Sequence, residues 1–143
     1  MLIPHTLFMA PVFAMIALTF FAVLKMGNKR TSSITAREVK IKDIALSEQA
    51  WSDEVKKISN AYASQMQLPL VFYTVAGFYL ILDKADLPAL ILSWAFVATR
   101  YIHFYIHTTS NHVPKRFMAF VAGIVVLICL WLWLAFRLYA LGQ

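Results

Sequence analysis

Hydrophobic residues fall into four long stretches separated by short polar segments: Leu7–Leu24, Ile58–Leu82, Leu87–Thr99 and Phe117–Phe136. A membrane-spanning helix needs about 20 mainly apolar residues, and the first, second and fourth stretches approach or exceed that length. The third reaches it only if the helix continues through residues 100–107. The pattern therefore predicts an all-α integral membrane protein built as a four-transmembrane-helix bundle.

Polar residues at the ends of these stretches set the expected boundaries. Ser52 followed by two acids, Asp86 followed by Pro88, and Pro114 are typical of helix starts. Pro69 lies inside the second stretch, where it is expected to kink the helix and loosen the carbonyls one turn earlier. The prediction is one membrane domain over residues 1–143, with helices at about 3–25, 52–82, 86–110 and 114–140 and a cytoplasmic loop at 27–51.

Composition and charge support a membrane protein and give its orientation. Hydrophobic residues make up 61% of the chain, against about 45–50% in soluble domains. The net charge of +6 comes from Lys and Arg gathered in residues 25–57 and at 115–116. The positive-inside rule places both basic loops in the cytoplasm and both termini outside. The charge thus describes membrane topology, and no nucleic-acid partner is expected.

Polar residues on the third stretch form the strongest functional signal. Arg100, His103, His107 and Asn111 follow one another at spacings of three, four and four, which places them along one helix face. A charged side chain at membrane depth costs about 2.5–3.5 kcal/mol on insertion scales, so it usually faces a partner, a cavity or a site. This face is predicted to line a functional site.

A second polar stripe lies on the second stretch, where Asn60, Ser64 and Gln67 are spaced by four and three. Two interpretations stay open: hydrogen-bonding contacts between helices, worth about 0.6–2 kcal/mol each, or a wall that faces a ligand. At the start of the fourth helix, Arg116 opposes the helix dipole, which favours a functional role. Gly123 and Ala119 provide a small-residue face for close helix contact.

Two segments of the chain resemble bacterial members of the MAPEG family, the membrane-associated proteins of eicosanoid and glutathione metabolism. One is Val39–Trp51 together with Ser59–Tyr73. The other is Ala98–Phe117, which has an arginine, a histidine three residues later and a second arginine sixteen residues after the first. Here these are Arg100, His103 and Arg116. The resemblance covers about two-thirds of the chain and agrees with the four-helix topology.

The resemblance implies a homotrimer in the bilayer, here the bacterial inner membrane, that binds glutathione between neighbouring protomers near the cytoplasmic side. A hydrophobic small-molecule substrate would enter from the lipid. Arg116 is similar to the arginine that stabilises the glutathione thiolate. Glutathione contacts would come from Arg100, His103, His107, Asn60, Ser64 and Gln67. The chain departs from the family's pattern at Gln67, where Glu is usual, and at Ser64, where Asn is common.

Three functions follow as hypotheses. The first is a glutathione-dependent transferase or peroxidase that acts on a lipophilic electrophile, with Arg116 as the catalytic residue. The second is a non-catalytic lipid-binding or scaffold member of the same family, which the neutral Gln67 favours. The third is a metal or haem protein, because His103 and His107 lie one helical turn apart and His112 is nearby; we expect no metal, because helical His pairs mostly lack further ligands.

Overall fold

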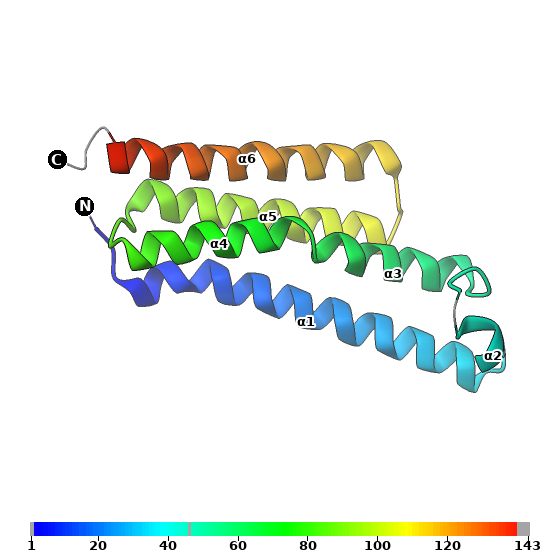
Figure 1. Cartoon of the computed structure of the whole chain (residues 1–143). Coiled ribbons are helices and arrows are strands. Elements are labelled where there is room, and N and C mark those ends of the chain that lie inside the picture. Colours follow the sequence, from blue (N-terminus) through cyan, green and yellow to red (C-terminus); the bar gives the residue numbers. More distant parts are fainter. Residues whose placement is uncertain (1, 46, 140–143) are drawn as a thin grey trace.

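A computed structural model of the chain describes residues 2–45 and 47–139, and these form an elongated bundle of antiparallel helices (Figure 1). The first and last described residues lie at one end of the bundle, and the connection that carries α2 lies at the other. The helices are α1 (His5–Thr35), α2 (Ile41–Ile44), α3 (Asp53–Gln65), α4 (Leu68–Ile81), α5 (Leu87–Thr108) and α6 (Val113–Tyr139).

Three of these helices, α1, α5 and α6, are long and apolar enough to cross a membrane. Helices α3 and α4 have 13 and 14 residues, and neither alone reaches the about 20 residues that a span requires. The chain is therefore an all-helical integral membrane protein in contact with lipid. Predicted helix ends agree within about two residues for α5 and for the start of α6; the predicted end at residue 140 lies outside the described residues.

Helix α1 extends ten residues beyond its predicted end at Lys25, so the predicted loop at 27–51 is helical as far as Thr35. The apolar pattern stops near Leu24, but the polar extension packs against α3. Lys29 pairs with Glu54 at 2.8 Å, and Arg30 donates from Nη2 to Ser59 Oγ at 2.9 Å. Contacts with α3 therefore stabilise the polar part of α1 that follows its apolar stretch.

The predicted helix at 52–82 forms two helices, α3 and α4, because the helical conformation is interrupted at Met66 and Gln67. Pro69 has no N–H to offer the carbonyl four residues earlier and lies in the first turn of α4. The expected kink is therefore a complete interruption of the helix. The predicted caps are confirmed: Ser52 Oγ accepts from the Val55 N–H at 3.4 Å and Asp86 Oδ1 from the Ala89 N–H at 3.0 Å.

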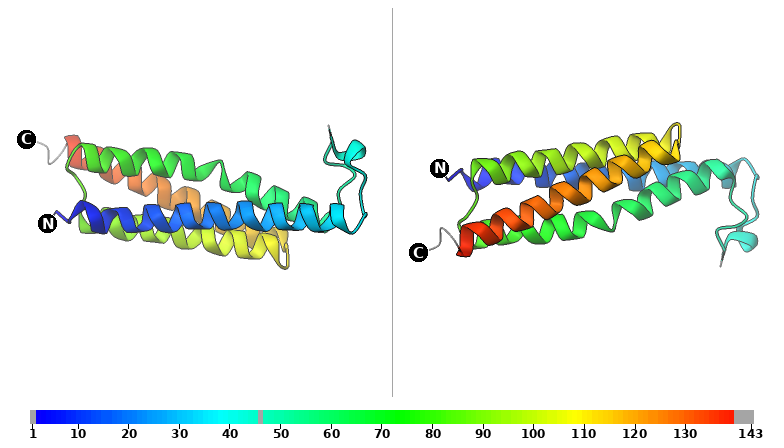
Figure 2. Two further views of the ribbon diagram at one scale, coloured as in Figure 1. Left: turned by 90° about the horizontal axis from the view of Figure 1, so that it is seen from below. Right: turned by 90° about the horizontal axis from the view of Figure 1, so that it is seen from above.

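Helices α5 and α6 form the most extensive helix pair, and α6 crosses the other helices obliquely (Figure 2). Aromatic rings fill the core between the helices: Phe72 of α4 stacks on Phe96 of α5 at 4.9 Å, and Phe8 of α1 lies 5.5 Å from Tyr79 of α4. All four rings are fully buried. This core fixes α5 from several sides and holds its polar face in place.

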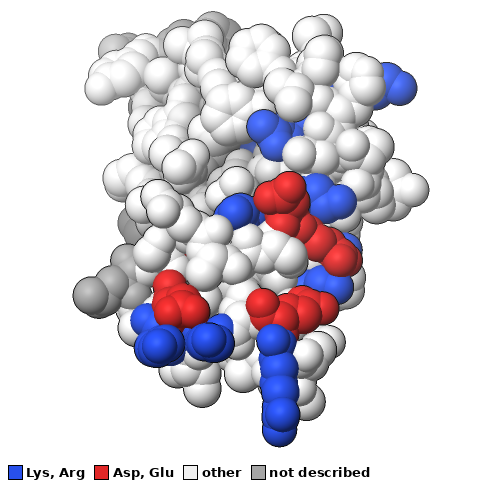
Figure 3. Space-filling model, turned by 90° about the vertical axis from the view of Figure 1, so that its right-hand side faces the viewer, with Lys and Arg blue, Asp and Glu red and all other residues white. Residues whose placement is uncertain are grey.

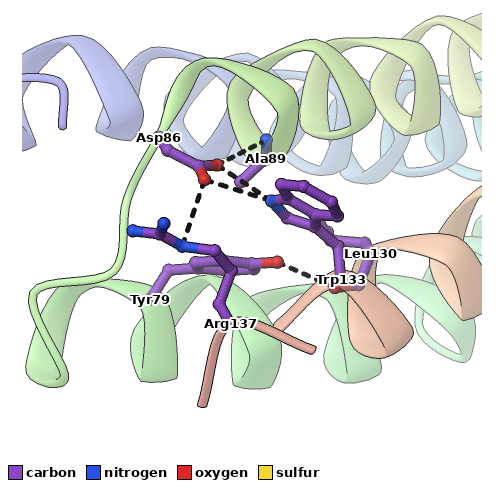
Figure 4. Close-up of polar contacts among 6 residues, drawn as sticks. All are labelled: Tyr79, Asp86, Ala89, Leu130, Trp133 and Arg137. Atoms are coloured by element: carbon purple, nitrogen blue, oxygen red, sulfur yellow. Dashed lines mark hydrogen bonds and ion pairs between the residues drawn. The ribbon is translucent and has the colours of Figure 1, made fainter. Parts of the chain in front are cut away.

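A buried polar cluster ties the helices together at the end where the chain begins (Figure 4). Asp86 caps α5 and accepts hydrogen bonds from Trp133 Nε1 at 3.1 and 3.2 Å. Arg137 Nε lies 3.3 Å from Asp86 Oδ2, and the Tyr79 hydroxyl donates to the Leu130 carbonyl at 2.9 Å. One carboxylate therefore fixes the start of α5 against the end of α6.

We expect Asp86→Asn to lower the free energy of unfolding by about 1–2 kcal/mol, because the amide leaves the half-buried Arg137 without its counter-charge. Asp83→Asn is the matched control, since Asp83 is exposed and its partner His5 is half-exposed, so little change is expected. Thermal unfolding in detergent measures both. Equal stability of the two variants would show that the Asp86 cluster contributes little.

Candidate functional site

Arg100, in the second half of α5, is completely buried. Its Nη2 donates to the Ser64 carbonyl at 3.2 Å, to Ser64 Oγ at 3.4 Å and to Gln65 Oε1 at 3.1 Å. These acceptors lie in the last turn of α3, directly before the break at Met66 and Gln67. The interruption of the helix therefore supplies a carbonyl that holds the guanidinium group between α3 and α5.

Two histidines continue the polar face of α5 beyond Arg100. His103 and His107 are 4% and 5% exposed, and their ring centroids lie 5.5 Å apart in an edge-to-face arrangement. Phe120 of α6 lies 6.0 Å from the His103 ring and 6.0 Å from the guanidinium carbon of Arg100. The predicted shared face is thus confirmed for Arg100, His103 and His107, and α6 covers part of it. The prediction was wrong for Asn111, because α5 ends at Thr108 and Asn111 lies in the turn that follows.

Arg116 lies in the first turn of α6 and is partly exposed. Its Nη1 donates to Asn111 Oδ1 at 2.6 Å. Asn111 follows the end of α5 with a positive φ of 49°, a conformation that asparagine tolerates better than most residues. The same residue therefore turns the chain between α5 and α6 and orients Arg116.

Neither Arg100 nor Arg116 pairs with a carboxylate within residues 2–45 and 47–139. The chain has seven acidic residues, which are Glu38, Asp43, Glu48, Asp53, Glu54, Asp83 and Asp86. Within the described part of the chain, their ion pairs go to His5, Lys29, Arg30, Lys56 and Arg137. Arg100 Nε and Nη1, Gln65 Nε2 and His107 Nδ1 are buried there without a hydrogen-bond partner. The result is a buried region with donors and positive charge in excess, which suits an anionic group.

The polar stripe predicted on the second stretch is only partly directed towards Arg100. Ser64 contacts it, but the side chains of Asn60 and Gln67 are exposed on the outer surface of α3 and of the break. The residue that faces inward is Gln65, which is 1% exposed and which sequence reasoning missed. Its signal was present in the buried series Ile58, Ala61 and Gln65, whose spacing of three and four marks one helix face.

Gly123 of α6 permits the close approach of α6 to the polar face of α5. A Cβ atom at this position would lie 2.9 Å from Thr99 Oγ1 and 3.9 Å from Arg100 Cδ. A Cβ atom at Gly77 of α4 would have no heavy atom within 4 Å. The small-residue contact predicted at Gly123 is therefore present, and it lies beside Arg100.

Gly123→Leu is expected to lower the free energy of unfolding by about 1–2 kcal/mol, because the added side chain forces α6 away from α5. The same substitution at Gly77 enters open space and serves as the control. Thermal unfolding of both variants gives the comparison. If Gly77→Leu is destabilised as much as Gly123→Leu, the close contact is not what the glycine preserves.

The end of the molecule that carries α2 is strongly charged, with Lys and Arg interspersed with Asp and Glu (Figure 3). Lys29 donates a hydrogen bond to Glu54, which lowers the pKa of this carboxyl group. Arg30 pairs with Glu48 and its guanidinium carbon lies 5.3 Å from the Trp51 ring centroid. Lys29 and Arg30 are thus paired with carboxylates, whereas Arg100 and Arg116 have no such pair among the described residues.

His103 and His107 are not joined by a third metal-binding side chain among the described residues. No cluster of three or more His, Cys, Asp and Glu side chains occurs within residues 2–45 and 47–139. His112 is exposed at the turn after α5, where its Nδ1 accepts from the Lys115 N–H at 3.4 Å.

Together, the apolar helices define a helical membrane protein in which the buried polar face of α5 lies against α3 and α6. The model of the MAPEG family matches residues 8–136, nearly the whole chain, and the protein belongs to this family. Its membership links it to the membrane proteins of eicosanoid and glutathione metabolism. Neither the curated proteins nor the solved structures gave a match.

Proposed function

We propose that this protein is a membrane-bound glutathione-dependent transferase or peroxidase that acts on a lipophilic electrophile. The single observation that carries the proposal is the excess positive charge of Arg100 and Arg116 beside two imidazoles, without a carboxylate partner among the described residues. Glutathione carries two carboxylates and a thiol that becomes anionic when it reacts. Its chemistry complements a region of this charge.

Arg116 is the proposed catalytic residue, because it is partly exposed and is oriented by Asn111. A free thiol has a pKa of about 8.5, and only its thiolate is a good nucleophile. Lowering that pKa to about 6.5 requires roughly 2.7 kcal/mol. One guanidinium group at about 4 Å, in an effective dielectric near 20, contributes on the order of 4 kcal/mol. One positioned arginine is therefore sufficient.

In the transferase reaction, the thiolate sulfur attacks the electrophilic carbon of the substrate. With an aryl halide, the new bond is carbon to sulfur, the bond that breaks is carbon to halogen, and halide leaves with the electron pair. The thiol proton passes to solvent when glutathione binds. Arg100, His103 and His107 are buried in a single chain, so in this proposal Arg100 acts on glutathione through its charge, and all three residues help to hold α3, α5 and α6 together.

We further propose that α3 and α4 cross the membrane together as one interrupted span, which gives four spans with the basic loops in the cytoplasm and both termini outside. The protomers would assemble as a homotrimer in the bacterial inner membrane. Gln67 supports this assembly, because its side chain is exposed on a single chain at the start of the apolar helix α4. Amide groups facing lipid are costly, and a neighbouring protomer would cover them.

In a trimer of this kind, Asn60, Ser64 and Gln67 of one protomer would bind the glutathione backbone and Arg116 of a neighbour would contact its sulfur. The test is conjugation of glutathione to an aryl halide by the purified protein in detergent, with protein-free micelles as the control. Conjugation well above that control supports the proposal. A rate equal to the control, for protein that remains folded, contradicts the transferase reaction; glutathione-dependent reduction of a lipid hydroperoxide tests the peroxidase in the same way.

A non-catalytic lipid-binding or scaffold protein is the second candidate, and one observation favours it. Gln67 is neutral and exposed, so it offers no carboxylate to the ammonium group of glutathione. Thermal unfolding in millimolar glutathione separates the candidates. The enzyme is expected to be stabilised, by about 2.7 kcal/mol at a concentration of 100 times Kd, and the scaffold protein is expected to show no shift.

A further inference from the structure

Three hollows follow one face of α1 in sequence. The first, of about 290 Å³, lies between α1 and α5 beside Ala14 and Tyr101. The second, of about 260 Å³, is lined by Leu18, Phe21, Lys25 and Tyr101 among others. The third, of about 610 Å³, shares Phe21 and Lys25 with the second and continues past Ser32. The first and second hollows meet at Tyr101, whose hydroxyl donates to the Ala14 carbonyl at 2.8 Å and so separates them, and the second and third share Phe21 and Lys25. This row of hollows along α1 is called the groove.

The α1 residues that line this groove lie on a single helix face. Ala14, Leu18, Phe21, Lys25, Asn28 and Ser32 are spaced by four, three, four, three and four, the spacing of one helical stripe. The stripe is apolar up to Phe21 and polar from Lys25 onward. The groove therefore changes from an apolar channel to a polar basin at the level where the membrane-spanning part of α1 ends.

On α5 the change in polarity occurs at the same level. Trp94, Val97 and Tyr101 line the apolar part of the groove, and Thr108 and Thr109 line it near Lys25. The hydroxyl groups at the end of α5 thus lie at the same level as the ammonium group of Lys25 on α1. The groove therefore matches an amphipathic molecule, with an acyl chain in the apolar part and a polar group near Lys25.

The ammonium group at this transition has no counter-ion in the described part of the chain. Lys25 Nζ lies 5.9 Å from the ring centroids of both Phe21 and Phe104, and none of the ion pairs of residues 2–45 and 47–139 includes it. Lys29, one turn further, is paired with Glu54 at 2.8 Å. The groove therefore has one available cation, held by two aromatic rings at the entrance to the apolar channel.

We infer that this groove binds an anionic phospholipid of the surrounding bilayer, with one acyl chain between α1 and α5 and its phosphate at Lys25. Asn28, Ser32, Thr108 and Thr109 surround the headgroup. An uncompensated lysine at the membrane surface selects anionic over zwitterionic lipids, and the apolar channel holds the chain. The inference uses α1 and the outer face of α5 and is independent of the proposed reaction with glutathione.

Native mass spectrometry of the purified protein in micelles with equal amounts of phosphatidylglycerol and phosphatidylcholine tests the inference. We expect the wild type to retain phosphatidylglycerol about five-fold more than phosphatidylcholine, the effect of one surface lysine. Lys25→Gln should remove this preference, and Lys25→Arg should keep it. Lys42→Gln removes the same charge from the exposed connection that carries α2 and should leave the preference unchanged.

Aromatic residues provide a matched test of the acyl channel. Phe20 and Phe21 are both exposed, but only Phe21 lines the groove. Phe21→Ala should reduce retention of phosphatidylglycerol several-fold and Phe20→Ala should not. Soluble glycerol phosphate should not displace the lipid, because it lacks the acyl chain.

Three results would overturn the inference. These are equal retention of the two lipids by the wild type, an unchanged preference in Lys25→Gln, and release of the lipid by glycerol phosphate. The first would indicate a site for acyl chains of any lipid, or a groove covered by a second copy of the chain if no lipid is retained. Since glutathione binding is measured separately, neither proposal depends on the outcome for the other.

Discussion

Replacement of Arg116 by alanine is expected to lower the rate of glutathione conjugation in a strongly pH-dependent way. If Arg116 holds the thiol pKa near 6.5, its loss returns that pKa to about 8.5. The thiolate fraction then falls by roughly 90-fold at pH 5.5 and about 25-fold at pH 7, and it is nearly unchanged at pH 9. Initial rates with an aryl halide between these pH values measure the effect.

The pH profile distinguishes loss of thiolate stabilisation from a general loss of structure. A distorted protein would lose activity by a similar factor at every pH, whereas the proposed role predicts recovery at high pH. Lys115→Ala is the matched control, since Lys115 is the exposed neighbour of Arg116 at the start of α6. Arg116→Lys keeps the charge and should retain part of the activity. Arg116→Ala with wild-type rates at pH 5.5 would exclude Arg116 as the catalytic residue.

Arg100→Met is expected to weaken glutathione binding by about ten- to thirty-fold with little net change in stability, because removal of the buried charge offsets the loss of the hydrogen bonds to Ser64 and Gln65. A unit charge that acts over roughly 8–10 Å, in an effective dielectric near 20, contributes on the order of 1.5–2 kcal/mol to the binding of an anion. Methionine fills the buried volume of Arg100 without its uncompensated charge. Isothermal titration with glutathione and thermal unfolding together measure the two effects.

Arg100→Ala provides the contrast, because it removes the charge and also leaves a cavity between α3 and α5. It should destabilise the protein by about 2–4 kcal/mol. If Arg100→Met is also strongly destabilised and still binds glutathione as the wild type does, Arg100 is a structural link from α5 to Ser64 and Gln65. Its charge then has no part in binding.

The hydrophobic pattern was sufficient to predict the long helices but not where two of them end. It located α5 and α6 because Asp86, Pro88 and Pro114 mark their starts directly in the sequence. It placed the end of α1 at Lys25, since the extension to Thr35 depends on the pairs of Lys29 and Arg30 with a distant part of the chain. Contacts between residues far apart in sequence leave no trace in a local pattern.

The candidate site was predicted well on α5 and less well on α3. Three polar residues at helical spacing inside an apolar segment predict a shared buried face. Arg100, His103 and His107 form such a face. On α3, the stripe of Asn60 and Gln67 points outward and Gln65 points inward. The sequence of this segment allows either of two helix faces to be the buried one. Only the packing of α3 on α5 determines that the face with Gln65 is buried.

In the proposed reaction a glutathione thiolate forms beside Arg116, and this thiolate can be detected by its ultraviolet absorbance. Difference spectra of glutathione with the purified protein, recorded across the pH range, report the pKa of the bound thiol. The account predicts a thiolate band at pH 7 that titrates about two pH units below free glutathione and is lost in Arg116→Ala. A bound thiol that titrates with the pKa of free glutathione, or the absence of any bound thiolate, would contradict it.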